Sequence, residues 1–185
     1  QQEDMKKESA LAYVGHNSRG DREENDFYPT PESATVALLQ HQKFEGDIWE
    51  CACGDGAISK VLLQHGYKVY SSDLIDRGYG STGKDFLQSD LKADNIVTNP
   101  PFNISLEFAL KALKCVKKKA VFFHKLVFLE SKKRQKNLFS LNKLEKVLIM
   151  PGRLAFKGYK TGGLMCFAWF IFDVNYNGKP TIDWI

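Results

Sequence analysis

Short apolar runs typical of strands alternate with segments typical of helices through most of this chain. The runs cover 47–52, 68–72, 94–98, 120–123, 145–150 and 164–174, and helices are expected over 31–41, 58–65, 105–118 and 130–138. Such alternation predicts a parallel sheet with helices on both faces. The turn pair Asn177-Gly178 predicts a hairpin that returns into 181–184. We therefore expect an α/β, Rossmann-like, doubly wound and mostly parallel seven-stranded sheet with an antiparallel C-terminal hairpin.

The chain length and composition suit one domain. It has 185 residues, and 43% of them are hydrophobic, enough for a sizeable core. Residues 1–26 are polar and charged, so we expect a mobile arm ahead of a single domain over 27–185. We expect no separate recognition domain within this length. Thr30-Pro31-Glu32 predicts a helix start, with Thr30 as the cap and Pro31 in the first helical position.

Composition also disfavours several classes of protein. The polar start of the chain lacks the apolar core of a signal peptide, and the longest apolar run, 164–172, is too short to span a bilayer. We expect a soluble, cytoplasmic protein without membrane contact. The four cysteines form no Cys-x-x-Cys pair, so no metal site is expected. A net charge of +4 permits a polyanionic partner without requiring one.

A glycine-rich turn follows the first expected strand. In Cys53-Gly54-Asp55-Gly56, two glycines allow the backbone to approach a ligand closely, and the next helix points its N-terminus toward it. Asp73 closes the second strand about twenty residues later, where a carboxylate can accept hydrogen bonds from both hydroxyls of a ribose. Ile58 and Ser59 follow the turn instead of a third glycine, which disfavours a dinucleotide. This spacing predicts a nucleoside cofactor.

The segment Asn99-Pro100-Pro101-Phe102 follows the third expected strand directly. Its two prolines fix the backbone and remove two donors. We expect the Pro100 carbonyl and the Asn99 side-chain carbonyl to form two acceptors for one planar NH₂ group. Phe102 offers a ring on which a base can stack. The segment therefore predicts a site that holds an amino group of a flat, aromatic substrate.

With these motifs in this order, the chain resembles the amino-methyltransferases that depend on S-adenosylmethionine, in which Asn/Asp/Ser-Pro-Pro-Tyr/Phe is the catalytic motif. The resemblance spans residues 27 to 174. It also includes the Phe-Tyr-Pro-Thr-Pro segment at 27–31, and segments 128–134 and 153–156 are similar to small adenine methyltransferases of phages and mobile elements. The resemblance implies methyl transfer from S-adenosylmethionine to adenine N6 in DNA, with Asn99, Pro100, Pro101 and Phe102 as catalytic residues.

The same resemblance assigns cofactor contacts. Residues near the methionine end of S-adenosylmethionine would be Tyr28, Thr30, Pro31, Glu50 and the turn residues Cys53, Gly54 and Gly56. Asp73 would hold the ribose, Asp85 and the Phe86 backbone would receive the adenine amino group, and Leu74 or Phe102 would pack on that ring. Phe at position 102 replaces the more frequent Tyr, and stacking needs only the ring.

A base inside a duplex is out of reach, so the target must flip out or be single-stranded. Contacts to the nucleic-acid backbone require cations. The candidates are Lys117 to Lys119, Lys132, Lys133, Arg134 and Lys136, and the residues Arg153, Lys157, Tyr159 and Lys160 in and before the loop 157–163.

Other interpretations stay open. RNA adenine offers the same chemistry as DNA adenine, and a protein glutamine has a similar planar amide. A different class is an inactive module that binds nucleic acid, which the intact Asn99-Pro100-Pro101-Phe102 disfavours. Cytosine N4 transfer is more often associated with Ser at position 99. The sequence leaves the oligomeric state and the target sequence open.

Overall fold

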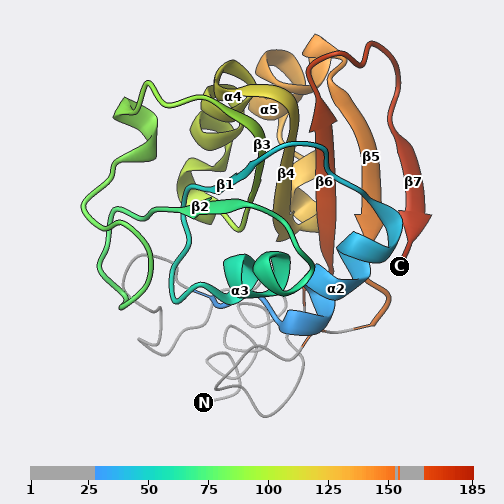
Figure 1. The fold of residues 1–185 in the computed structure, drawn as a ribbon. Helices are drawn as coiled ribbons and strands as arrows, with labels where there is room; N and C mark the ends of the chain where they lie inside the picture. The colour runs from blue at the N-terminus through green and yellow to red at the C-terminus, as the bar shows by residue number, and fades with distance from the viewer. Residues whose placement is uncertain (1–27, 153, 155–164) are drawn as a thin grey trace, which may run out of the picture.

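Seven strands of the described residues form one mixed sheet in the order β2-β1-β3-β4-β6-β5-β7 (Figure 1). The structure, a computed structural model, describes residues 28–152, 154 and 165–185. The expected arm 1–26 and the candidates Arg153, Lys157, Tyr159 and Lys160 lie outside the described residues. The strands are β1 (Ile48–Glu50), β2 (Val69–Ser71), β3 (Ala93–Thr98), β4 (Val116–Lys125), β5 (Leu144–Ile149), β6 (Phe167–Asp173) and β7 (Thr181–Trp184).

Helices cover both faces of this sheet, as the alternation predicted. Helices α2 (Glu32–His41) and α3 (Ala57–Gln64) pack on one face, and α4 (Ser105–Cys115) and α5 (Lys132–Asn137) lie on the other (Figure 1). Short 3₁₀ turns are η1 (Phe86–Gln88), η2 (Phe102–Ile104), η3 (Leu126–Leu129) and η4 (Phe139–Leu141). No helix within the described ranges is both long enough and apolar enough to cross a bilayer.

The two central strands divide their side chains between two separate cores. Val97 of β3 and Val121 of β4 pack with the α2 and α3 side, whereas Ile96 and Ala120 pack with the α4 side. This follows from the two-residue period of a strand, because both faces of a central strand are buried. The near-continuous apolar runs in the sequence are explained by this double burial.

The α/β, mostly parallel seven-stranded sheet is confirmed, but its antiparallel part differs from the expected hairpin. Strand β6 runs antiparallel to both β4 and β5, whereas β7 pairs parallel with β5 on the far side (Figure 1). The Asn177-Gly178 turn therefore does not close a hairpin between β6 and β7. Instead the connection passes the start of β5, where the Gly178 N–H donates to the Asn142 carbonyl.

The helix expected over 105–118 was too long. Helix α4 ends at Cys115, and the lysines Lys117 to Lys119 belong to β4. Lys119 lies beside Asn95 of β3 and forms ion pairs with Glu145 and Asp173. Helical propensity of a lysine run is a weak preference, and strand pairing plus two carboxylate partners overrides it.

The start of α2 also differs from the sequence prediction. The helix begins at Glu32, and Pro31 precedes it without a side-chain cap. The Thr30 hydroxyl does not cap the helix because it accepts a hydrogen bond from the side-chain amide of Asn99, 69 residues along the chain. The first segment of the described chain is thereby attached to the end of β3.

Candidate active site

A cavity of about 560 Å³ opens at the carboxyl ends of the parallel strands β1, β2 and β3. This edge is where open parallel sheets bind their ligands. Its walls come from the segments before α2, after β1, after β2 and after β3. The lining residues are Tyr28, Pro29, Thr30, Glu50 to Asp55, Ala57, Ile58, Asp73 to Ile75, Arg77, Lys84 to Phe86, Asn99, Pro101, Asn103, Ile104 and Phe108.

Glu50 is the buried acid of this cavity. It ends β1 with 2% of its surface exposed, and the Ser59 backbone N–H donates to its carboxyl at 2.8 Å while the Ser59 hydroxyl donates to the same oxygen. Burial raises the pKa of Glu50 to about 8, although the Ser59 hydrogen bonds act against this rise. A neutral carboxyl at the cavity wall can therefore ionise when a cation binds beside it.

Asp73 links the end of β2 to the turn after β1. One carboxylate oxygen accepts the Gly54 N–H at 2.8 Å, and the other accepts the Ile75 N–H at 2.9 Å. Each oxygen keeps a further lone pair. The side chain is thus fixed in orientation while it can still accept hydrogen bonds from a ligand with two adjacent hydroxyls.

Another wall of the cavity is formed by the chain after β2. Asp85 caps η1 by accepting the Leu87 N–H at 3.0 Å, and Phe86 is buried behind it. Arg77 and Lys84 line the same part of the cavity, although no sequence pattern singled them out. They flank the segment 78–83, which contains three glycines, and do not directly follow a strand, which explains why they were not predicted.

Asn99 has a defined orientation at the end of β3. Its side-chain nitrogen donates to the Tyr28 carbonyl at 2.9 Å and to the Thr30 hydroxyl at 3.0 Å. A backbone carbonyl can only accept, so the amide nitrogen must face it. The Asn99 carbonyl oxygen is consequently left as the acceptor on the cavity side.

The two prolines after Asn99 differ in their carbonyls. The Pro101 carbonyl accepts the Ile104 N–H at 3.4 Å in the turn η2. The Pro100 carbonyl accepts no backbone N–H of the described residues. A second acceptor thus lies next to Asn99 in the sequence, as the motif predicted, although Pro100 itself is buried and does not line the cavity.

Phe102 lies outside the cavity and belongs to an aromatic group beside it. Its ring is nearly parallel to that of Tyr28, at 11° with 6.1 Å between centroids, and lies 4.6 Å from the His124 ring. The ammonium of Lys125 lies 4.5 Å from the centre of the Phe102 ring. The suggestion that Phe102 packs on a cofactor ring within the cavity is therefore not supported, whereas Leu74 does line it.

His124 and Lys125 end β4 and were missed by the sequence analysis. His124 is 4% exposed, and burial lowers the pKa of its imidazole to about 4, so the ring is neutral near pH 7. The apolar run predicted a strand that ends at Phe123, two residues before the end of β4. Both residues directly follow the predicted run 120–123, so the rule that functional residues lie at the carboxyl ends of parallel strands could have selected them.

The other predicted site residues divide into two groups. Tyr28, Thr30, Glu50, Cys53, Gly54, Asp73, Leu74, Asp85, Phe86, Asn99 and Pro101 line one cavity, whereas Pro31, Gly56, Pro100 and Phe102 do not. Gly56 has a φ of +83°, and a Cβ there would lie 2.6 Å from the Tyr79 ring. This glycine is required by packing of the turn.

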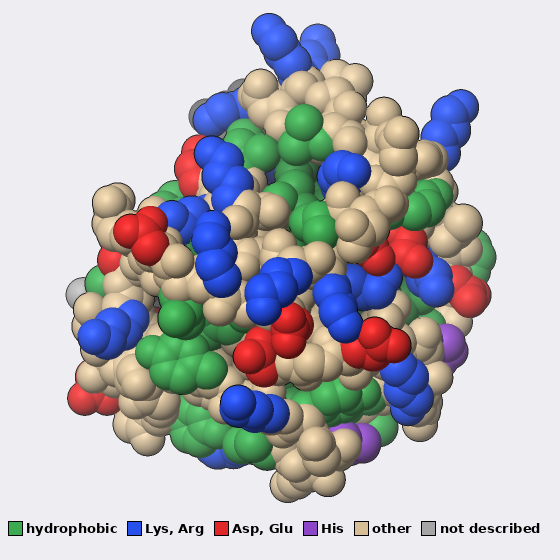
Figure 2. Space-filling view, turned by 45° about the horizontal axis from the view of Figure 1, so that its top comes forward, with side chains coloured by type: hydrophobic (Ala, Val, Ile, Leu, Met, Phe, Trp, Pro, Cys, Tyr) green, Lys and Arg blue, Asp and Glu red, His purple; other side chains and the backbone are tan. Residues whose placement is uncertain are grey.

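Most candidate cations have partners in the protein or lie far from the cavity. Lys117 pairs with Asp94, and Lys118 pairs with Glu45, at the opposite end of the sheet. Figure 2, which brings the top of Figure 1 forward, shows basic and acidic side chains interleaved on that face. Lys117 and Lys118 on this face therefore fit a role in stabilising the fold better than a role in contacting nucleic acid.

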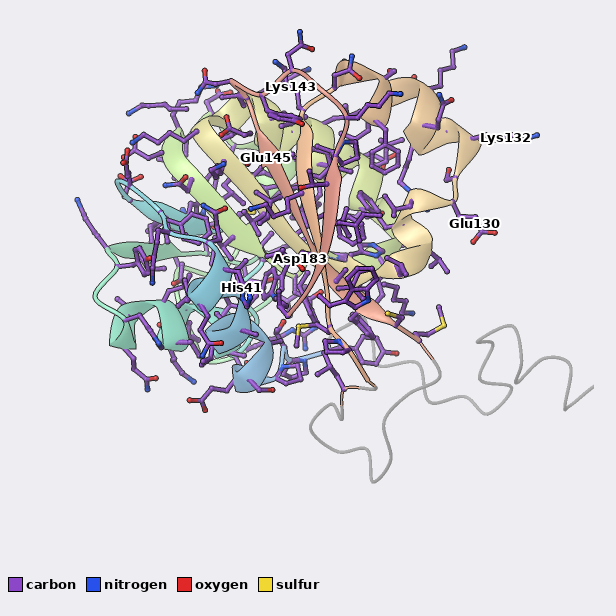
Figure 3. All side chains as sticks on the ribbon, turned by 90° about the vertical axis from the view of Figure 1, so that its right-hand side faces the viewer. His41, Glu130, Lys132, Lys143, Glu145 and Asp183 are labelled. Carbon is purple, nitrogen blue, oxygen red and sulfur yellow. The ribbon has the colours of Figure 1, made fainter. Side chains whose placement is uncertain are left out.

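The basic helix α5 contains cations that bind other groups of the protein and a cation that extends into solvent. The Arg134 guanidinium donates to the carbonyls of Phe128 and Val127, so it supports the turn η3. Lys133 pairs with Glu107 at 3.5 Å. Lys132 extends away from the body of the protein (Figure 3). Of these three side chains, that of Lys132 is therefore the best placed to meet a partner from solvent.

No group of three or more His, Cys, Asp or Glu that could hold a metal ion occurs within the residues that the structure describes. No protein-family model matches the sequence. A comparison with curated protein sequences finds no match either.

Solved structures share the fold. The modification subunit of a proposed type I restriction enzyme from Vibrio vulnificus YJ016 is 13% identical with a TM-score of 0.64, over 95% of this chain and 50% of that chain. This chain thus spans about half the length of that subunit. A proposed RNA methyltransferase from Pyrococcus horikoshii is 15% identical with a TM-score of 0.63, over 91% and 98%. A proposed class I S-adenosylmethionine-dependent methyltransferase from Listeria monocytogenes is 13% identical with a TM-score of 0.63, over 98% and 72%. At sequence identities of 13–15%, the likeness to these structures establishes the fold alone.

Proposed function

We propose that this chain is a methyltransferase that uses S-adenosylmethionine to methylate the N6 amino group of adenine in DNA. The observation that carries the proposal is the orientation of Asn99, whose amide nitrogen is held by Tyr28 and Thr30. The remaining carbonyl oxygen suits an amino group that donates. The named neighbours with this fold, among them a restriction-enzyme modification subunit, support methyl transfer to nucleic acid.

The cavity fits S-adenosylmethionine by the chemistry of its donors and acceptors. Glu50 can pair with the ammonium of the methionine part, and Asp73 can accept hydrogen bonds from the two ribose hydroxyls. Asp85 lines the same cavity and can accept a hydrogen bond from the adenine amino group. A cofactor that carries two cationic groups suits a wall with four carboxyl groups, those of Glu50, Asp55, Asp73 and Asp85. When bound, S-adenosylmethionine supplies an activated methyl group on a sulfonium.

The residues of the motif would make the substrate nitrogen reactive. The lone pair of an aromatic amine is delocalised into the ring and is a poor nucleophile. Donation of its two hydrogens to the Asn99 side-chain oxygen and the Pro100 carbonyl favours tetrahedral geometry and localises the lone pair. The chain thereby positions and polarises the substrate, and no strong base is required.

Asn at position 99 favours adenine N6 over cytosine N4, and the resemblance of the whole motif order favours DNA as the substrate. RNA adenine has the same amino group, and one solved neighbour is named as an RNA methyltransferase. A protein glutamine presents a planar amide that the same two acceptors could hold. The chemistry at Asn99 is common to all three, so the substrate must be identified directly.

A transfer assay tests this proposal. The protein is incubated with methyl-labelled S-adenosylmethionine and with DNA, RNA or protein, and labelled nucleosides are identified after digestion. We expect N6-methyladenine in DNA. Asn99→Ala should abolish transfer while cofactor binding, measured by calorimetry, persists. Asn175→Ala, an exposed residue beyond β6, is the matched control and should retain activity.

Two outcomes would contradict the proposal. Label in protein alone would replace nucleic acid by a glutamine substrate. Normal turnover by Asn99→Ala would refute the role of the two acceptors, because the variant retains only one of them.

A further inference from the structure

Apolar side chains from two segments line the cavity. Leu74 and Ile75, which follow β2, are 57% and 36% exposed although both belong to the cavity wall. Phe86 and Phe108 line it as well, and their ring centroids lie 4.8 Å apart, so η1 is held against α4. Apolar side chains that are open to solvent within a cavity suit the flat ring of a ligand. In the proposed cofactor this ring is adenine.

Asn103 adds an amide to this wall. It follows Phe102 in the turn η2, is exposed, and lines the cavity together with Ile104 and Phe108. Ile104 and Phe108 are four residues apart, about one helical turn, so Asn103 lies at the edge of the wall that packs on Phe86. Within the described part of the chain, the Asn103 side chain forms no hydrogen bond. Its amide therefore offers both a donor and an acceptor to a ligand.

Asn99, four residues earlier, differs from Asn103 in this respect. The amide nitrogen of Asn99 donates to the Tyr28 carbonyl and the Thr30 hydroxyl, so its oxygen is the group left for a ligand. Asn99 thus suits an amino group, which only donates. Asn103 suits a ligand edge on which a donor lies beside an acceptor.

Adenine has such an edge. Its N6 amino group donates and the neighbouring N7 accepts, and asparagine pairs with both groups when it reads adenine in nucleic acids. The second hydrogen of the amino group points away from N7. Asp85 can accept this hydrogen through the oxygen that does not bind the Leu87 N–H. Asp85 and Asn103 together therefore match both hydrogens of one amino group and one ring nitrogen.

We propose that Asn103 recognises the adenine of the cofactor, by accepting a hydrogen bond from N6 and donating one to N7. This inference rests on the function proposed above and adds a specificity residue to its cofactor site. Asn103 and Asp85 thereby select adenine over a purine with an oxygen at position 6. Such a purine would place an acceptor against the Asp85 carboxylate, where no hydrogen bond can form.

The test removes the ring nitrogen and the side chain separately and together. Calorimetry measures the binding of S-adenosylhomocysteine and of its 7-deaza analogue, in which a C–H group replaces N7. The wild type should bind the analogue roughly three- to tenfold more weakly than the parent compound, because one hydrogen bond is lost. Asn103→Ala should bind the parent compound about tenfold more weakly than the wild type does, and should bind the two compounds equally.

Three further variants separate this contact from a general weakening of the site. Asp85→Asn should weaken both compounds and keep the wild-type ratio between them, since Asp85 does not contact N7. Asn103→Asp places an acceptor against N7, so this variant should bind the 7-deaza analogue at least as well as the parent compound. Asn175→Ala, an exposed asparagine beyond β6, should match the wild type with both compounds. The unfolding midpoint of Asn103→Ala should equal that of the wild type.

The remaining outcomes count against the inference. Equal binding of the two compounds by the wild type would mean that N7 has no partner in the cavity. A wild-type ratio in Asn103→Ala would assign N7 to another residue. Unchanged affinity of Asn103→Ala for the parent compound, with a raised KM for DNA, would place Asn103 on the substrate instead. A wild type that binds neither S-adenosylhomocysteine nor S-adenosylmethionine would refute the proposed function, and this inference with it.

Discussion

Replacement of Glu50 by glutamine tests the electrostatics of the proposed cofactor site. In the folded protein burial raises the pKa of Glu50 to about 8, compared with an ordinary value of 4.5. A difference of that size corresponds to about 5 kcal/mol, at about 1.4 kcal/mol for each pH unit. Stability from this group is complete below pH 4.5, declines as pH rises, and is lost above pH 8, because the folded state binds the extra proton.

A glutamine at this position has no proton to lose, so the variant should not show this decline. We expect Glu50→Gln to match the wild type near pH 4.5 and to exceed its unfolding free energy by a few kcal/mol at pH 8.5. Urea unfolding of the cofactor-free protein from pH 4.5 to 9 measures the difference. Glu130→Gln is the control, because Glu130 points away from the protein (Figure 3) and should leave the profile unchanged.

Cofactor binding should depend on the same proton. Glu50 must ionise to pair with the methionine ammonium, so affinity for S-adenosylmethionine should rise up to tenfold per pH unit below pH 8 and then level off. Calorimetry in two buffers of different ionisation enthalpy should detect a released proton, and Glu50→Gln should bind more weakly without that release. An equal stability difference between variant and wild type at pH 4.5 and 8.5 would refute the reasoning.

Two further substitutions test single contacts. Thr30→Val removes one acceptor from the Asn99 amide nitrogen, and we expect kcat at saturating cofactor to fall about tenfold. An unaltered kcat would mean that the Tyr28 carbonyl alone orients Asn99. Lys119→Met leaves the carboxylates of Glu145 and Asp173 without their cation, and should lower the unfolding free energy by about 1–3 kcal/mol with full methyl transfer at low temperature. An unchanged midpoint in urea would contradict the second expectation.

The sequence predicted which residues line the cavity better than it predicted the edges of the elements. Glu50, Asp73 and Asn99 could be selected because each closes or follows an apolar run, and parallel strands bring such positions to one edge. The order of the strands beyond β4 could not be predicted. Asn177-Gly178 is a strong local hairpin pattern, but β7 finds its partner in β5 through contacts distant in the sequence.

The orientation of Asn99 is a second feature that local patterns could not predict. The motif identifies the residue, but the bonds that orient it come from Tyr28 and Thr30, about seventy residues earlier. The sequence assigned Thr30 to a helix cap because Thr before Pro is common there. In the folded protein the Thr30 hydroxyl accepts a hydrogen bond from the Asn99 side chain instead, and the helix begins without a side-chain cap.

The placement of charge refines what the net charge of +4 means for function. The densest lysine run, Lys117 to Lys119, lies at the amino end of β4 and is matched there by acids, so it adds little to the field at the cavity. At the carboxyl end, by contrast, one strand places a neutral imidazole and a cation against Phe102. A nucleic acid would therefore be recognised through a few cations around the transfer site.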